Sequence, residues 1–238
     1  MYSYDSRIRY SEVDETGNLK IEALLDYFQD CSTFHSEDLG LGVSYLKEQH
    51  MVWMISSWQI IVERYPQFGD TVTVGTAPYF FKGFLGYRNF LMTDTQGKRL
   101  AYANTIWSLI NTDNAKPTKL TEKMAEKYVL EPKLEMDYAP RKIEIPEESR
   151  KGEPIQIRPN HLDTNHHVNN GQYVRIAMDS LSKDFRIRQL RAEYKKQVYL
   201  NDVLVPYISC TQDGKYIVAL KNEKEDACCI VELQEERK

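Results

Sequence analysis

The feature that most constrains the fold is a polar segment that occurs once in each half of the chain. "IRYSEVDETGNL" begins at Ile8, and "IRPNHLDTNHHV" begins at Ile157. Both segments share an initial Ile-Arg pair, an aspartate at the matching position (Asp14 and Asp163) and apolar residues at two further positions. A repeat of this kind indicates two copies of one structural unit. The alternative is a chance match, because the identities are few.

A helix-like segment and then strand-like segments follow each copy. In the first half, Ile21, Leu24, Leu25 and Phe28 have the i, i+3, i+4, i+7 spacing of a helix with one apolar face. A weaker stripe follows the second copy and consists of Tyr173, Ile176, Ala177, Ser180 and Leu181. The strand-like segments are separated by turn signals such as "DTQGK" and "DGK". The chain is therefore predicted to be α+β, with an antiparallel sheet wrapped around one long helix in each half.

The segment between the halves has a different composition. Residues 119–152 are rich in Lys, Glu and Pro, which is typical of a solvated surface, with one short helix expected over 121–128. We predict an N-terminal domain at 1–130, a linker at 131–152 and a C-terminal domain at 153–238.

Composition excludes several classes of protein. The chain has 42% hydrophobic and 28% charged residues and a net charge of −4, which gives no sign of nucleic-acid binding. Its start has no secretory signal, and no apolar run is long enough to span a membrane. The four cysteines lack metal-ligand spacing and fit free thiols in a reducing compartment. We therefore expect a cytoplasmic globular protein without membrane contact.

The second copy of the repeat carries the densest group of reactive side chains. Three of the five histidines, His161, His166 and His167, lie within one short stretch that also contains Asp163 and several asparagines. Polar residues ahead of a helix form either an elaborate cap or a reaction site. Asp163 alone fits an N-cap, and His161 and His166 fit supporting or solvent-facing positions. A zinc site built from His161, Asp163 and His167 is a further alternative, but no other cluster of ligands supports it, so no metal is expected.

Three segments resemble the acyl-acyl carrier protein thioesterases, a family of plant plastid enzymes with bacterial relatives. "LDTNHHVNNGQY" is similar to the family signature Asp-x-Asn-x-His-Val-Asn-Asn-x-x-Tyr at every defined position. "WMISSWQIIVERYPQFGDTVTV" and "GYRNFLMTDTQGKRLAYANTIWSLIN" resemble family segments of the first half. The resemblance covers nearly the whole chain and implies two tandem hot-dog domains, of which the first shapes the acyl-chain pocket and the second carries catalysis.

The resemblance also implies a reaction. It is the hydrolysis of fatty acyl-acyl carrier protein to free fatty acid and carrier, which ends chain elongation in fatty acid biosynthesis, without a cofactor. The partner is the carrier protein with its phosphopantetheine-linked acyl chain, and the basic segment "RIRQLRAEYKK" is a candidate for contacting it.

The family assigns catalysis to Asp163, Asn165 and His167. A histidine has an ordinary pKa of about 6.5, so His167 suits a general base or acid, and the positive end of the following helix suits an oxyanion. Asn169 is expected to brace the helix start. The first copy has Thr16 and Asn18 at the positions of Asn165 and His167, so only the second half is chemically complete.

One departure from the family bears on the mechanism. Plant members have a Glu-Tyr-Arg-Arg-Glu-Cys stretch, whereas this chain has "EYKKQV", with Gln197 and Val198 at the last two positions. A glutamate base and a cysteine nucleophile are therefore both excluded there. Gln197 can still hold a water molecule, and proton transfer falls to Asp163 and His167, or to Glu193, which would share the strand parity of Gln197.

Two other functions are compatible with the same fold. One is an acyl-CoA thioesterase, and another is a sensor that binds acyl thioesters without hydrolysing them, which the missing glutamate favours. The sequence leaves the acyl chain length undetermined. A monomer and a homodimer are both compatible with a tandem pair of domains.

Overall fold

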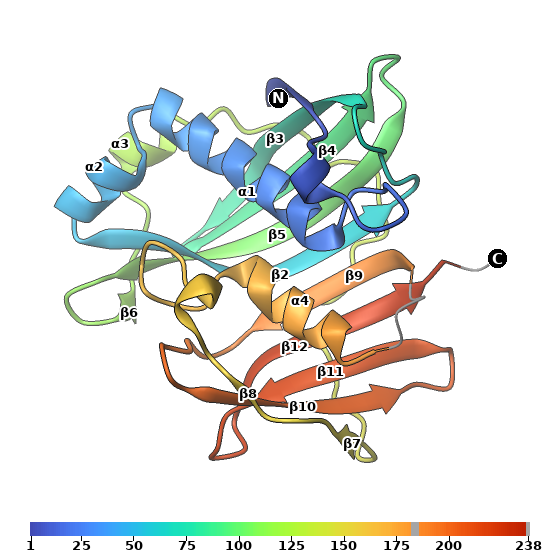
Figure 1. The fold of residues 1–238 in the computed structure, drawn as a ribbon. Helices are drawn as coiled ribbons and strands as arrows, with labels where there is room; N and C mark the ends of the chain where they lie inside the picture. The colour runs from blue at the N-terminus through green and yellow to red at the C-terminus, as the bar shows by residue number, and fades with distance from the viewer. Residues whose placement is uncertain (182–185, 237–238) are drawn as a thin grey trace. The chain divides into compact units, whose positions relative to one another are not determined.

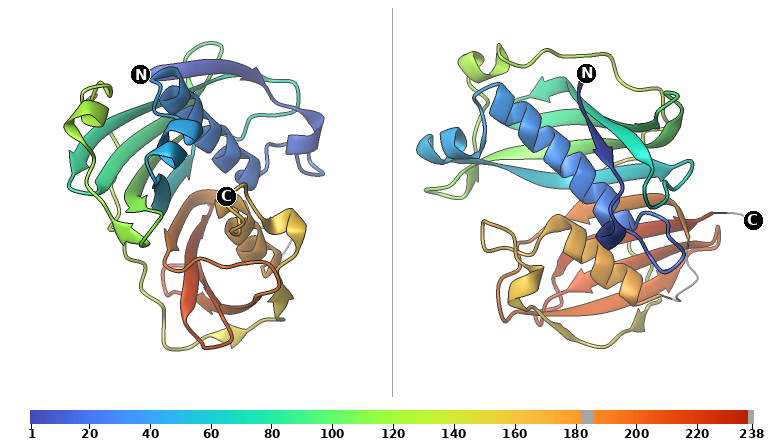
Figure 2. Two further views of the ribbon diagram at one scale, coloured as in Figure 1. Left: turned by 90° about the vertical axis from the view of Figure 1, so that its left-hand side faces the viewer. Right: turned by 45° about the horizontal axis from the view of Figure 1, so that its top comes forward.

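The computed structural model describes residues 1–181 and 186–236 and divides the chain into two compact units. Unit 1 contains Met1–Ser56 and Ile60–Tyr138, and unit 2 contains Ser57–Gln59 and Ala139–Lys238. In each unit, one main helix lies in the hollow of a curved sheet (Figures 1 and 2). The predicted α+β architecture, with a helix wrapped by an antiparallel sheet in each half, is therefore confirmed.

The sheet of unit 1 has the strand order β1-β3-β4-β5-β2, and a short strand, β6, pairs with β5. β3, β4 and β5 form an antiparallel meander, and the predicted "DTQGK" turn joins β4 to β5. In that turn Asp94 accepts hydrogen bonds from the backbone of Gln96 and Lys98, each at 3.0 Å. The strands are β1 (Tyr2–Arg7), β2 (Met51–Val62), β3 (Thr71–Lys82), β4 (Leu85–Asp94), β5 (Arg99–Asn111) and β6 (Lys116–Pro117).

The main helix of unit 1 is α1 (Ile21–Asp38), which contacts β1 and β3. The four residues of the predicted apolar stripe are all buried, and Phe28 packs against Phe90 of β4 with ring centroids 5.3 Å apart. The remaining helical segments of unit 1 are η1 (Tyr10–Glu12), α2 (Val43–Glu48) and α3 (Glu122–Ala125). α3 is shorter than the expected helix at 121–128, and Thr121 caps it by accepting from the backbone N of Met124.

The sheet of unit 2 has the order β9-β12-β11-β10-β7, with β8 paired to β10. α4 (Asn170–Asp179) contacts β11 and β12 through a buried face that includes Tyr173, Ile176 and Ala177. Leu181, predicted to extend this stripe, lies beyond the helix end. The other elements are β7 (Arg150–Lys151), β8 (Ile155–Gln156), η2 (Pro159–His161), β9 (Ile187–Tyr194), β10 (Val203–Cys210), β11 (Lys215–Lys221) and β12 (Ala227–Glu235).

The segment expected to be a solvated linker is held by side chains from the sheets. Three buried acceptors each bind one of its backbone N–H groups: Asn89 binds Leu134 (3.1 Å), Gln59 binds Ala139 (2.9 Å) and Glu193 binds Ile143 (3.0 Å). The boundary between the two units falls inside this segment, at Tyr138 and Ala139. Its charged side chains are mostly exposed, but its backbone is part of the fold.

No helix of the described residues combines the length and the apolar character that spanning a bilayer requires.

Candidate functional site

The second copy of the repeat folds into a tight loop that Asp163 organises. Leu162 and Val168 form an antiparallel bridge at its base. Inside the loop, Asp163 Oδ1 accepts from the backbone N of Asn165 (2.8 Å) and of His167 (3.3 Å). The backbone N of Asp163 in turn donates to the His167 carbonyl at 2.8 Å. The carboxylate therefore binds the backbone of both Asn165 and His167 within one short loop.

Asp163 is not the cap of the following helix. That position belongs to Asn169, whose Oδ1 accepts from the backbone N of Gly171 at 2.8 Å, as expected of a residue that braces the helix start. The Asn169 carbonyl also accepts from the backbone N of Gln172. Asn169 thus engages two of the first N–H groups of α4, and these two are not available to an oxyanion.

His167 is half-buried and faces an aromatic ring. Its imidazole meets Tyr199 edge-on, with ring centroids 5.0 Å apart and an interplanar angle of 76°. Burial lowers the pKa of His167 below its ordinary value, the Asp163 charge opposes that shift, and His166 adds to it. The neutral imidazole, which can accept a proton, is therefore the form present near neutral pH.

Tyr199, whose ring contacts His167, also binds Gln197. The Tyr199 hydroxyl donates to Gln197 Oε1 at 2.9 Å, while the backbone N of Val168 donates to the Val198 carbonyl at 3.0 Å. The segment after β9 is thereby tied to the end of the Asp163 loop. Tyr199 was missed in the sequence, where its only signal is an aromatic residue two positions after Gln197.

Glu193 lies in β9 and contacts the linker. The parity argument that linked it to Gln197 is wrong, because β9 ends at Tyr194 and Gln197 lies outside the strand. The Glu193 side chain is buried, accepts from the backbone N of Ile143 and lies 4.0 Å from Lys195 Nζ. Its contacts are with the linker, so they give no support to Glu193 as a base.

The remaining histidines of the stretch have other surroundings. His161 Nδ1 accepts from the backbone N of Arg158 at 3.1 Å and so belongs to the turn η2. His166 is exposed and has a left-handed backbone (φ 61°). Among residues 1–181 and 186–236, no group of three His, Cys, Asp or Glu side chains is placed to hold a metal ion, so the zinc alternative gains no support.

The basic segment at 186–196 is largely neutralised within unit 2. Arg191 pairs with Glu232 (3.0 Å), Lys196 with Asp226 (2.7 Å) and Arg186 with Glu236 (3.8 Å). These pairs leave little free positive charge for contacting an acidic carrier protein there.

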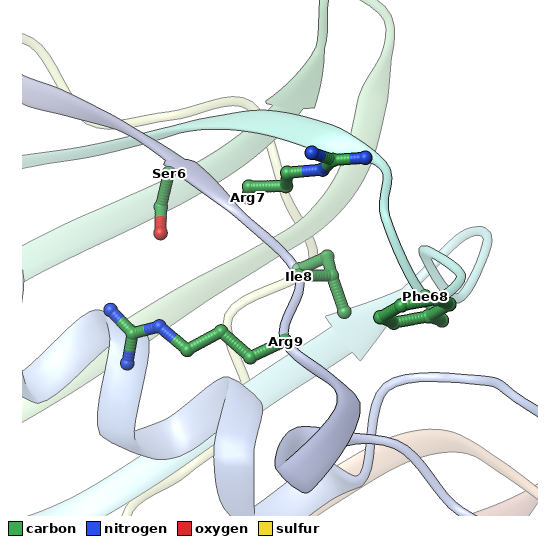
Figure 3. A pocket seen from close by; sticks show the side chains of 5 residues that line it. All are labelled: Ser6, Arg7, Ile8, Arg9 and Phe68. Carbon is green, nitrogen blue, oxygen red and sulfur yellow. The ribbon is translucent and has the colours of Figure 1, made fainter.

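A groove of about 480 Å³ lies in unit 1 and is separate from these residues. It is lined by Ser6, Arg7, Ile8, Arg9 and Phe68, which Figure 3 shows at the end of β1 and the neighbouring loop. Both arginines are engaged, since Arg7 Nε donates to the Gly69 carbonyl and Arg9 pairs with Glu12. None of the predicted site residues lines this groove.

Comparisons with known proteins agree with the division of the chain into two halves. The family model for the acyl-ACP thioesterase N-terminal domain matches residues 1–128, and that for the C-terminal domain matches residues 143–235. A relative from Cuphea viscosissima, acyl-[acyl-carrier-protein] hydrolase FATB3, is 28% identical over 214 residues, covering 83% of this chain and 52% of the relative. Oleoyl-acyl carrier protein thioesterase 1 of Arabidopsis thaliana is 22% identical over 228 residues, covering 87% and 63%. The chain thus spans about half the length of the FATB relatives.

Solved structures show the same fold. An acyl-ACP thioesterase from Bacteroides thetaiotaomicron has a TM-score of 0.89 at 22% identity, covering 98% of this chain and 97% of that one. A 12:0-ACP thioesterase from Umbellularia californica has a TM-score of 0.84 at 19% identity, covering 100% and 98%. The expected tandem hot-dog fold is confirmed. Because the family models match both halves, the chain belongs to the acyl-ACP thioesterase family.

Proposed function

We propose that this protein hydrolyses the thioester of fatty acyl-acyl carrier protein and releases a free fatty acid and the carrier. The observation that carries the proposal is the Asp163 loop, which brings Asn165 and a neutral, half-buried His167 together in a member of this family. The relatives from Cuphea and Arabidopsis have names that state this reaction.

In the proposed mechanism, His167 acts as the general base. It takes a proton from a water molecule that attacks the thioester carbonyl, and then gives that proton to the departing thiolate. Neutral imidazole suits the first step, and burial favours that form. Gln197 has no carboxylate and cannot take the proton, and Glu193 is held by the linker.

Asp163 and Asn165 support this chemistry from the same loop. Asp163 holds the backbone of His167, and its negative charge stabilises the imidazolium that forms when His167 is protonated. The Asn165 side chain is exposed and can position water or the substrate carbonyl without titrating. Unit 2 would thus carry the chemistry, and the first domain, at residues 1–130, would shape the acyl-chain pocket.

The partner in this proposal is the carrier protein, with the acyl chain on its phosphopantetheine arm. A reducing compartment such as the cytoplasm suits the protein, because all four cysteines are free thiols and three of them are buried.

The test is thiol release from a panel of acyl-carrier-protein and acyl-CoA substrates of different chain lengths. We expect higher kcat/KM with carrier-bound substrates, and a loss of about 10²-fold or more in His167→Ala with unchanged Tm. His166→Ala is the matched control, because it alters the adjacent exposed histidine. Preference for CoA substrates would favour an acyl-CoA thioesterase, and binding without turnover would favour the sensor.

A further inference from the structure

A tight turn in unit 2 fixes the backbone of Tyr199. The Tyr199 N donates to Asp202 Oδ2 at 2.9 Å, and its carbonyl accepts from the Asp202 N at 3.2 Å. The buried Ile157 bonds to the same turn twice: its N donates to the Asp202 carbonyl (2.9 Å), and its carbonyl accepts from the Asn201 N (3.2 Å). Asn201 has a left-handed backbone with φ 70°. These bonds hold the Cα of Tyr199 in one place.

Unit 1 contains the same turn. The Gln67 N donates to Asp70 Oδ2 at 2.9 Å, and the Asp70 N donates to the Gln67 carbonyl at 3.0 Å. Ile8 bonds to this turn through its N (2.9 Å) and its carbonyl (3.0 Å), and Gly69 is left-handed with φ 86°. The bonds of the turn are therefore common to both halves and belong to the fold. Gln67 is the counterpart of Tyr199.

The residues that face each other across this turn differ between the two units. In unit 1, Asn18 and Gln67 form an antiparallel bridge, and both have amide side chains. In unit 2, the matching residues are His167 and Tyr199, whose ring centroids are 5.0 Å apart at an interplanar angle of 76°. Aromatic pairs favour this edge-on arrangement. The tyrosine thus accompanies the histidine on a backbone that is otherwise shared, which points to a role of the pair rather than of the turn.

The ring of Tyr199 is held at both ends. The turn fixes its Cα, and its hydroxyl donates to Gln197 Oε1 at 2.9 Å. Between these two residues, the carbonyl of the buried Val198 accepts from the backbone N of Val168, the residue after His167. The turn and the histidine loop are therefore joined beside the ring contact. A side chain locked in this way can fix the orientation of its neighbour.

We propose that Tyr199 is a positioning residue for His167, and that its ring holds the imidazole in one orientation and shields it from water. The inference rests on the proposed function, in which His167 is the general base. A base must present the same nitrogen to the attacking water in every turnover, and small displacements of a catalytic group are costly. Shielding from water favours the neutral imidazole, which is the form that accepts a proton.

The charges around His167 allow the effect of the ring to be measured separately. Burial is the largest cause of the lowered pKa of His167, and the Tyr199 ring contributes to that burial by contact. Asp163 raises this pKa and His166 lowers it, both from the same loop. A substitution at position 199 leaves these two charged groups in place. A change in the titration of His167 would therefore report the loss of the ring.

NMR titration of the His167 ring in the full chain, together with kinetics on acyl-carrier-protein substrates, tests the proposal. The His167 signal is assigned by its absence in His167→Asn. Tyr199→Gln introduces the residue at the matching position of unit 1. We expect it to raise the pKa of His167 toward the ordinary value of about 6.5, and to lower kcat about tenfold with little change in KM. Tyr199→Phe keeps the ring and should keep the titration and most of the activity.

Leu200→Ala is the matched control, because Leu200 is the next residue of the same turn and is similarly exposed (44%, against 48% for Tyr199). It should leave both the titration and kcat unchanged. If Tyr199→Gln does not fold, Tyr199→Leu removes the ring while keeping an apolar side chain, and the same changes are expected of it.

The outcomes separate this role from the proposed reaction. An unchanged His167 titration, or an unchanged kcat, in the variant that lacks the ring would overturn the proposal and leave Tyr199 as part of the turn alone. Equal losses in Tyr199→Phe and Tyr199→Gln would overturn it too, because the ring would then not be the cause. If the wild type hydrolyses no acyl thioester, the proposed function fails, whereas the titration is independent of turnover and still decides whether the ring of Tyr199 controls His167.

Discussion

The two copies of the repeat fold alike but satisfy their polar groups differently. Both loops are closed by an antiparallel bridge and organised by an aspartate, Asp14 or Asp163. In the first loop, Thr16 Oγ1 donates to Asp14 (2.7 Å) and Asn18 Nδ2 donates to Thr16 (2.7 Å), so the side chains bond to one another. In the second loop, no hydrogen bond within the described residues joins the Asn165 or His167 side chain to Asp163.

This difference separates two roles of the same carboxylate. In both loops the aspartate accepts hydrogen bonds from backbone N–H groups, so we assign this role to folding. What is particular to the second loop is a histidine whose ring stays out of the loop's own network and faces Tyr199 instead. A loss of activity on removing Asp163 would thus combine a structural and a chemical effect. Removing Asp14 from the first loop is the control for the structural effect.

The largest expected effect comes from replacing a residue of the second loop with the residue at the matching position of the first loop. His167→Asn reproduces the residue found at position 18 and removes the proton acceptor. We expect kcat/KM for acyl-carrier-protein hydrolysis to fall by about 10²–10⁴-fold, because general-base catalysis is lost. The Tm should change little. Activity within a few-fold of wild type would show that His167 is not the base.

Removing each aspartate in turn sharpens the comparison. Asp14→Ala and Asp163→Ala each lose hydrogen bonds to backbone N–H groups, so each should lower the unfolding free energy by about 1 kcal/mol. Urea unfolding measures this cost in both variants. Only Asp163→Ala should also lower kcat/KM at temperatures where it is fully folded. An equal loss of activity in Asp14→Ala would contradict the division of roles.

A pH titration compares half-buried histidines of the two units, His35 and His167. Burial lowers the pKa of His35 to about 4 and lowers that of His167 less strongly. On acidification the unfolded chain binds protons at about pH 6.5, before the folded rings do, so stability present above this pH is lost as the pH falls. In the folded protein, NMR should show His167 protonating before His35. The reverse order would contradict the environments described for these rings.

The smallest effect is expected at the helix cap. Asn169→Ala removes the side-chain acceptor for the Gly171 N–H and should lower the unfolding free energy by about 1 kcal/mol. Asn165→Ala serves as the control, because its side chain is exposed and caps nothing. If the two variants unfold at the same urea concentration, the cap contributes nothing measurable.

The sequence predicted the features that depend on the spacing of residues within one segment. The matched positions of Asp14 and Asp163 predicted the duplication, and the apolar spacing from Ile21 to Phe28 predicted the buried face of α1.

Contacts between distant segments were not predictable in the same way. Tyr199 reaches His167 only because the chain leaves β9 at Tyr194, and the same early end invalidated the parity argument for Glu193. Arg88 contacts His35 and Tyr128, which are both far from it in sequence. Spacing rules apply within one element and do not report where a strand stops.

The side-chain hydrogen bonds to the linker backbone predict how fast its amide protons exchange in heavy water. Asn89, Gln59 and Glu193 are buried, and each binds a different linker amide. Amides bonded in this way exchange with solvent only when the bond opens, so Leu134, Ala139 and Ile143 should keep their protons as long as strand amides do. Hydrogen-exchange mass spectrometry would then register the segment between the domains as protected, in contrast to what its run of charges suggests.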